Sequence, residues 1–83
     1  MNSVIRELIA AHAGLPIAVA ELSDDADLYR AGMKSFASVQ LMLALEETFE
    51  VEFPEEMLTR DTFRSIGSIQ GALSTLAPGE MAA

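Results

Sequence analysis

The stretch from Ser35 to Phe49 constrains the fold most, because it carries apolar residues on two sides of one predicted helix. On a helical wheel, one set falls within roughly 100°, the usual width of a core stripe; it comprises Leu41, Met42, Leu45 and Phe49. A second set spans roughly 60° on another arc and comprises Phe36, Val39 and Leu43. A bundle helix needs one buried stripe, so the second predicts a partner-binding surface. The alternative is that the first helix and the long loop cover both stripes.

The remaining sequence predicts three further helices. Apolar residues recur at helical spacing from about Ser3 to Ala13, and again from Ile66 to Leu76 with Ser65 as the N-cap. Pro54 and the acids after it suit the first turn of a short helix over residues 55–60. The connection over residues 14–34 has a length that often marks a functional loop. Its apolar residues should pack on the bundle: Leu15, Ile17, Val19, Leu22, Leu28, Tyr29 and Met33.

We therefore expect an all-α fold, a small four-helix bundle with three longer helices, one short helix and a long first loop. Residues 1–83 form a single domain in this interpretation, because the sequence has no internal repeat, low-complexity tract or domain boundary. The core should include Leu41, Leu45 and Phe49 of the central helix and Ile66, Ile69 and Leu73 of the last one. Pro78-Gly79 should end that last helix, and the tail over residues 79–83 is expected to fray.

The chain is strongly acidic: 13 Asp and Glu against 5 Lys and Arg give a net charge of -8. Binding to nucleic acid or to an anionic membrane surface is not expected, since both depend on Lys and Arg. The lack of cysteine excludes disulfides, thiolate metal sites and a cysteine nucleophile. No apolar run is long enough to span a membrane, and residues 1–7 lack the pattern of a signal peptide. We expect a monomeric, cytoplasmic protein.

Ser35 is the main candidate site residue. It stands at the predicted start of the central helix, directly after Gly32-Met33-Lys34. Free backbone N–H groups and the positive end of the helix dipole favour an anion there, and Lys34 adds a cation. A phosphate attached to the Ser35 Oγ atom would therefore be stabilised electrostatically. By itself, however, the pattern is most often that of an ordinary N-cap, which contributes about 1 kcal/mol.

A longer pattern surrounds this serine. A turn with Leu28 and Gly32 precedes Lys34-Ser35-Phe36, and Leu45-Glu46-Glu47-Thr48-Phe49 and then Phe53-Pro54 follow it. This pattern resembles an acyl carrier protein, and the flanking helices extend the resemblance over nearly the whole chain. The resemblance implies an antiparallel four-helix fold. It also implies that a phosphopantetheinyl transferase attaches 4'-phosphopantetheine from coenzyme A covalently to Ser35, and that the protein is a carrier without catalytic residues.

A narrower resemblance rests on the string from Ser35 to Met42, with Ile5-Arg6-Glu7 and Glu52-Phe53-Pro54. These segments look like those of the bacterial aminoacyl carrier proteins. That resemblance implies loading by an amino acid:[carrier protein] ligase, an enzyme that itself resembles a truncated seryl-tRNA synthetase. The ligase would activate a small amino acid, glycine or alanine, and transfer it to the thiol of the arm as a thioester.

The chain also departs from the acyl carrier pattern. Lys34 stands where the family usually has Asp, and Ala37 and Gln40 stand where carriers of fatty-acid synthesis tend to have acids. Docking of the ligase is therefore predicted to depend less on charge than on an apolar surface. The predicted partner-binding residues are Met33, Lys34, Phe36, Val39 and Leu43. A carrier of the fatty-acid, polyketide or peptide-synthetase type and an unmodified helical interaction module stay open as alternatives.

Other polar residues receive simpler interpretations. His12 is the only histidine, but Ser35 lacks the Gly-x-Ser-x-Gly elbow, so a hydrolase triad is not expected. The aspartates over residues 24–27 lack the spacing of a calcium loop and are interpreted as a solvated acidic loop; no metal site is predicted. Glu46-Glu47 is interpreted as a solvated face or as a rim for salt-dependent docking.

Overall fold

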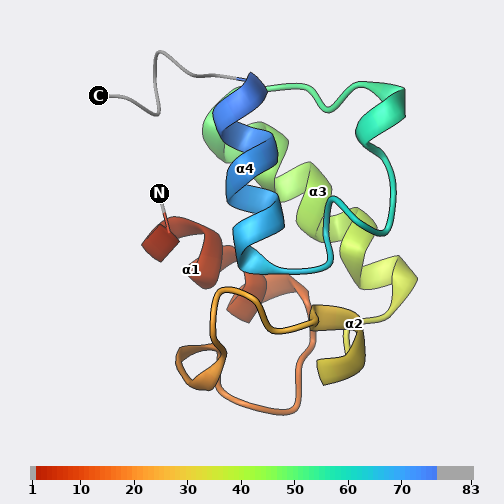
Figure 1. Ribbon diagram of the computed structural model, residues 1–83. Coiled ribbons are helices and arrows are strands. Elements are labelled where there is room, and N and C mark those ends of the chain that lie inside the picture. The colour runs from red at the N-terminus through yellow and green to blue at the C-terminus, as the bar shows by residue number, and fades with distance from the viewer. Residues whose placement is uncertain (1, 77–83) are drawn as a thin grey trace.

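The computed structural model describes residues 2–76, in which all regular structure is helical. Three longer helices, α1 (Asn2–His12), α3 (Ser35–Phe49) and α4 (Ile66–Leu76), form the body, and α1 contacts both of the others (Figure 1). The short α2 (Leu28–Ala31) and two 3-10 turns, η1 (Val19–Glu21) and η2 (Glu55–Met57), lie in the connections. The predicted all-α fold with four α-helices is confirmed.

Aliphatic side chains of the three longer helices form the core. They recur three or four residues apart, which places each set on one face of its helix. The fully buried members are Ile5, Ile9, Leu41, Leu45, Ile66, Ile69 and Leu73. Phe53 and Phe63 complete the core from the connection between α3 and α4, with ring centroids 5.3 Å apart in an edge-to-face arrangement. Phe49, predicted as core, is only half-buried.

The first connection contains more regular structure than the sequence predicts. Residues 14–34, expected to be a loop, include η1 and α2. Asp27 caps α2, because its Oδ1 atom accepts hydrogen bonds from the N–H groups of Tyr29 and Arg30 at 3.0 and 3.2 Å. A helix of four residues is too short to show the periodicity on which the prediction rests. The predicted packing of the apolar loop residues holds with one exception, Ile17, which is exposed.

The short helix predicted over residues 55–60 is wrong in type and length. Only Glu55–Met57 are helical, as one 3-10 turn after Pro54. The chain leaves this turn at Leu58, whose N–H donates to the Glu55 carbonyl at 3.0 Å. The short α-helix of the bundle is therefore α2, and residues 58–65 form an irregular segment that leads into α4.

The start of α4 is as predicted. Ser65 precedes it, and the Ser65 Oγ atom accepts a hydrogen bond from the Ser68 N–H at 3.0 Å, which is a capping interaction. The predicted stop at Pro78-Gly79 and the frayed tail over 79–83 lie outside the described residues. Among the helices of residues 2–76, none combines the length and apolar character needed to cross a membrane.

Candidate functional site

Gly32 sets the direction in which the chain passes from α2 to α3. Its backbone has a φ of +127°, a region that favours glycine. The N–H groups of Gly32 and Met33 donate back to the carbonyls of Tyr29 and Leu28 at 3.1 and 3.0 Å. After this turn the Met33 side chain enters the core, where it is 3% exposed. Gly32 and Met33 together fix the place where α3 begins.

Ser35 is the first residue of α3, and its side chain is exposed. The N-cap position belongs to Lys34, whose carbonyl accepts the Ser38 N–H at 3.0 Å. The prediction that Ser35 is the N-cap is therefore wrong by one residue. The cause is tertiary, because the Gly32 turn and the buried Met33 determine the helix start and override the preference of serine for the cap. Within residues 2–76, the Ser35 Oγ atom makes no hydrogen bond.

The N-terminus of α3 is open to an anion. The Lys34 side chain makes no capping hydrogen bond, and the first turn contains no acidic residue. By contrast, Asp27 caps α2 and Ser65 caps α4. The uncapped N–H groups and the helix dipole stabilise negative charge, and the exposed Lys34 adds a positive one. A negatively charged group on Ser35 would thus lie in a favourable field.

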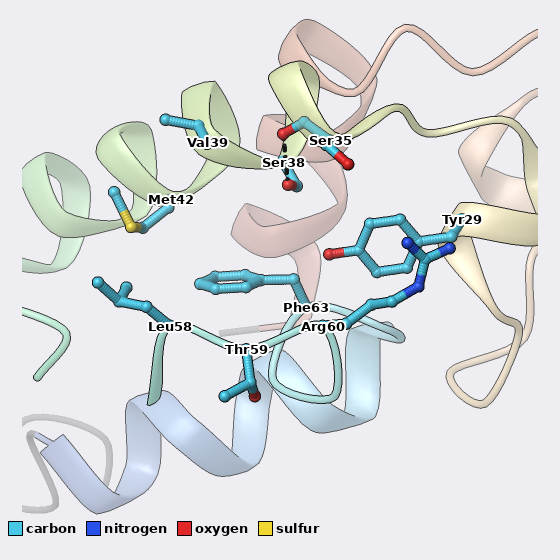
Figure 2. A pocket seen from close by; sticks show the side chains of 9 residues that line it. All are labelled: Tyr29, Ser35, Ser38, Val39, Met42, Leu58, Thr59, Arg60 and Phe63. Atoms are coloured by element: carbon cyan, nitrogen blue, oxygen red, sulfur yellow. Dashed lines mark hydrogen bonds between the residues drawn. The ribbon is translucent and has the colours of Figure 1, made fainter. Parts of the chain in front are cut away.

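A groove of about 350 Å³ adjoins Ser35, between α3 and the segment after η2 (Figure 2). Ser35, Ser38, Val39 and Met42 line it from α3, and Tyr29 lines it from α2. The opposite wall consists of Leu58, Thr59, Arg60 and Phe63. Sequence reasoning missed this groove, because its walls come from three segments that meet only in the folded protein.

Two contacts shape the end of the groove that contains Ser35. The Ser38 hydroxyl donates to the Ser35 carbonyl at 2.7 Å, so Ser38 is engaged whereas the Ser35 hydroxyl is free within residues 2–76. The guanidinium carbon of Arg60 lies 4.1 Å from the centroid of the Tyr29 ring, a cation–π contact. In Figure 2 the Tyr29 hydroxyl points into the space between Ser38 and Phe63. This end of the groove is therefore polar and carries a positive charge.

The second apolar stripe of α3 is exposed, as predicted. Phe36, Val39 and Leu43 retain exposed fractions of 74%, 50% and 55%. The alternative that the first helix and the long loop cover both stripes is therefore wrong. We call these three residues the docking stripe. Lys34 is exposed beside it. Met33 is not part of any surface, contrary to its prediction as a partner-binding residue, because the Gly32 turn directs it into the core.

A second hollow, of about 510 Å³, lies between α1 and α3. His12 lines it together with Leu43 and Glu47. Ser35 does not line this hollow, so the histidine and the serine face different cavities. Within residues 2–76, no group of three or more His, Asp or Glu side chains is placed to hold a metal ion.

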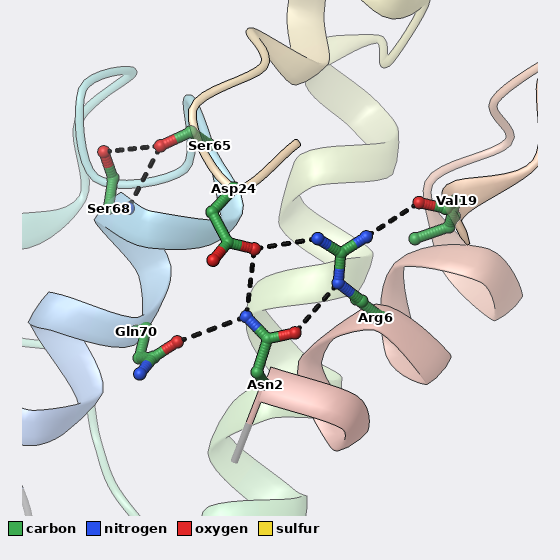
Figure 3. A network of polar contacts seen from close by, with 7 residues as sticks. All are labelled: Asn2, Arg6, Val19, Asp24, Ser65, Ser68 and Gln70. Atoms are coloured by element: carbon green, nitrogen blue, oxygen red, sulfur yellow. Dashed lines mark hydrogen bonds and ion pairs between the residues drawn. The ribbon is translucent and has the colours of Figure 1, made fainter. Parts of the chain in front are cut away.

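Asp24 and Asp25 of the acidic loop are exposed, as predicted, but the Asp24 carboxylate also makes structural contacts. Asp24 belongs to a polar network that joins the first connection to α1 (Figure 3). Its Oδ1 atom accepts hydrogen bonds from Asn2 at 3.0 Å and from Arg6 at 2.8 Å, and these lower the pKa of Asp24. Arg6 also donates to the Val19 carbonyl at 2.8 Å. The backbone of Asp24 reaches α4 as well, because its carbonyl accepts the Gly67 N–H at 2.9 Å.

Glu46 also differs from its predicted role. The sequence interpretation places it on a solvated face, but its carboxylate accepts a hydrogen bond from the Phe53 N–H at 2.8 Å. The contact joins the last turns of α3 to the segment that brings Phe53 into the core. Glu47, the neighbouring residue, is exposed as predicted.

Comparison with known proteins identifies relatives over nearly the whole chain. Residues 3–73 match the family model described as "Phosphopantetheine attachment site". The chain is 48% identical to the aminoacyl carrier protein of Agrobacterium fabrum over 83 residues, which are 100% of both chains.

Similar solved structures include carrier proteins in complex with ligases. One is an engineered Bradyrhizobium japonicum glycine:[carrier protein] ligase complexed with the carrier protein from Agrobacterium tumefaciens and AMP. The match has a TM-score of 0.87 at 50% identity and covers 89% of this chain and 99% of that one. Another is the Bradyrhizobium japonicum ligase complexed with glycylated carrier protein, where the TM-score is 0.73 at 25% identity, with 86% of this chain and 95% of that one covered.

Proposed function

The chain belongs to the family of carrier proteins with a phosphopantetheine attachment site, and from this premise we propose that Ser35 bears the arm and that the arm carries a small amino acid. Membership makes the chain a carrier and not an enzyme, and implies a covalently attached phosphopantetheine group. One observation carries the assignment to Ser35. Its hydroxyl is exposed and unbonded within residues 2–76, at a helix N-terminus that is open to an anion.

The chemistry of attachment suits this position. The Ser35 Oγ atom would form an ester bond to the phosphate of the phosphopantetheine part of coenzyme A, while the bond from that phosphate to the nucleotide breaks and the serine proton leaves. The resulting phosphodiester would keep one negative charge at the N-terminus of α3, beside Lys34. The arm supplies the thiol that a chain without cysteine lacks, so the cargo is held as a thioester.

We infer that the cargo is glycine or alanine. The inference draws on the aminoacyl carrier relative and on the similar carriers solved with glycine:[carrier protein] ligases, one of them glycylated. The proposed partners are a phosphopantetheinyl transferase and an amino acid:[carrier protein] ligase of the truncated seryl-tRNA synthetase type. The docking stripe and Lys34 are the proposed ligase-facing surface. We propose that the chain acts as a single-domain monomer in the cytoplasm.

The attachment site can be tested by intact-mass measurement. After incubation with coenzyme A and a phosphopantetheinyl transferase, the mass should rise by one phosphopantetheine, and Ser35→Ala should abolish the rise. Ser38→Ala is the matched control, because this serine lies one turn further along α3 and is engaged with the Ser35 carbonyl. It should accept the arm as wild type does. An unchanged mass of the wild-type protein, or modification of Ser35→Ala, would overturn the assignment.

A second experiment, with the holo protein, tests which kind of cargo the arm carries. One reaction offers a glycine:[carrier protein] ligase with ATP and glycine or alanine, and the other offers an acyl-carrier synthetase with a fatty acid. We expect a mass increase from one amino acid in the first reaction. Loading in the second reaction alone would overturn the aminoacyl assignment and would favour a carrier of the fatty-acid type.

A further inference from the structure

Within the part of the chain that the structure describes, Arg60 has no acidic partner, although the protein is strongly acidic. Within residues 2–76, Arg6 pairs with Asp24 at 2.8 Å and Arg64 pairs with Asp61 at 2.6 Å, whereas Arg60 forms no ion pair. The chain has 13 acids available and a net charge of -8. The Arg60 guanidinium instead lies over the Tyr29 ring and lines the same groove as Ser35. Its position therefore brings positive charge to the candidate attachment site.

The two ends of this groove differ in chemistry. Ser35, Ser38, Tyr29 and Arg60 contribute polar groups at one end, and Figure 2 shows Val39, Met42 and Leu58 grouped at the other. Phe63 lies between the two ends. A ligand that fits such a groove has an anionic group followed by a partly apolar chain. The phosphodiester of a phosphopantetheine arm, followed by its branched alkyl and amide chain, has this order of groups.

We infer that Arg60 binds the phosphodiester of the arm on Ser35, and that the groove holds the first part of the arm while the carrier is not docked. This inference rests on the proposed function, because it requires the arm to be on Ser35. Arg60 acts here as a positioning residue. A guanidinium stacked on Tyr29 keeps the N–H groups at its edge available, and these can bind a phosphate through two parallel hydrogen bonds.

The groove lies at the surface, and this limits the strength of the contact. Arg60 is exposed, so salt screens its attraction for a phosphate. Exposed ion pairs contribute little, and loss of such a pair is expected to change the population of the held arm about two- to fivefold. The arm therefore stays free to leave the groove when an enzyme takes up its thiol.

The absence of cysteine permits a direct test on the holo protein. The thiol of the arm is the only thiol, so a thiol-reactive nitroxide labels the arm alone. Paramagnetic relaxation of the backbone amides of residues 58–63 then reports how much of the time the arm spends near the groove. The comparison uses wild type, Arg60→Gln and the matched control Arg30→Gln. Each variant removes one arginine, so both change the net charge equally. Arg30 is also exposed and without an ion pair within residues 2–76, so neither variant breaks an ion pair.

We expect the relaxation enhancement at residues 58–63 to fall about two- to fivefold in Arg60→Gln and to stay at the wild-type level in Arg30→Gln. Arg60→Lys should give an intermediate value, because it keeps the charge but loses the planar fork. Amide spectra of the unmodified variants check that the fold is intact. Equal enhancement in wild type and Arg60→Gln, or an equal loss in both glutamine variants, would overturn the inference. Neither result would affect the proposed function, which the intact-mass and loading experiments test separately.

Discussion

Gly32 lies so close to Pro16 that a Cβ atom at position 32 would be 3.0 Å from the Pro16 Cδ atom. The same glycine has a φ of +127°, so both its conformation and its surroundings disfavour a side chain. This contact joins the early part of the first connection to the turn that precedes α3. The placement of Ser35 at the surface thus depends on a packing contact with a residue far from it in sequence.

Replacement of Gly32 by alanine is expected to lower the free energy of unfolding by about 1–3 kcal/mol, because the new methyl group meets Pro16 and the positive φ becomes strained. Urea denaturation followed by circular dichroism measures the effect. Gly71→Ala is the control: it lies inside α4 with nothing within 4 Å of the added Cβ atom, and should raise stability by about 0.5–1 kcal/mol. A loss of stability at position 71 equal to that at position 32 would contradict this account.

Alanine variants of Leu43 and Leu45 should distinguish an effect on docking from an effect on stability, because Leu43 is exposed on α3 and Leu45 is buried. Leu43 is 55% exposed, so Leu43→Ala should leave the free energy of unfolding within about 0.5 kcal/mol of wild type. Leu45 is fully buried, and Leu45→Ala should cost about 2–5 kcal/mol. Although it barely affects stability, Leu43→Ala should lower kcat/KM for loading by the ligase about tenfold, because it removes an anchor of the proposed interface.

A matched control for loading is Ile17→Ala, which truncates another exposed aliphatic residue, 46% exposed, that belongs to the first connection and not to α3. Its kcat/KM should equal that of wild type. A Leu43→Ala protein that loads at the wild-type rate would show that the docking stripe does not contact the ligase.

The sequence predicted the elements that depend on local pattern. The stretch from Ser35 to Phe49 has a long apolar pattern, and α3 ends at Phe49 as predicted and begins one residue earlier than predicted. Ser65 was identified as a cap because its position before an apolar run is a local signal. The exposed stripe was predicted because one helix in a small bundle has more apolar surface than its neighbours can cover.

The features that the sequence did not predict depend on contacts between distant segments. Met33 adjoins Lys34 and Ser35 in sequence, but the turn at Gly32 directs it into the core. The groove beside Ser35 is lined by Arg60 of the later segment and by Tyr29 of α2, which contact each other only in the folded protein. The roles of Asp24 and Glu46 are equally non-local, since each carboxylate binds a donor from another part of the chain. Periodicity and capping rules contain no information on such pairs.

Glu46 is expected to stabilise the connection after α3 through its contact with the Phe53 N–H. Glu46→Ala leaves this donor without a partner at a site where Phe53 is buried, and should cost about 1–3 kcal/mol of unfolding free energy. Glu46→Gln keeps an acceptor without the charge and should cost less. Glu47→Ala is the control for a loss of charge at the neighbouring exposed residue and should have little effect. Chemical denaturation of the three variants distinguishes the hydrogen bond from a general effect of charge.

The network around Asp24 predicts a dependence of stability on pH. Hydrogen bonds from Asn2 and Arg6 lower the pKa of Asp24 in the folded protein relative to the unfolded chain. A carboxylate of this kind contributes stability that is fully present above the unfolded-state pKa of about 4 and is lost as the pH falls through the folded-state pKa. The difference in unfolding free energy between wild type and Asp24→Asn should therefore be largest near neutral pH and shrink below about pH 4.

Comparison of two variants at each pH removes the general effect of acid on a chain with a net charge of -8, because protonation of the other carboxylates is common to both. The Asn2→Ala background supplies the decisive control, since the hydrogen bond from Asn2 is the main cause of the lowered pKa of Asp24. In that background the effect of Asp24→Asn should vary less with pH. Urea denaturation of the four proteins at pH 6 and at about pH 3, below the unfolded-state pKa, measures both differences. An effect of Asp24→Asn that is equal at the two pH values in the wild-type background would show that the network does not stabilise the ionised carboxylate.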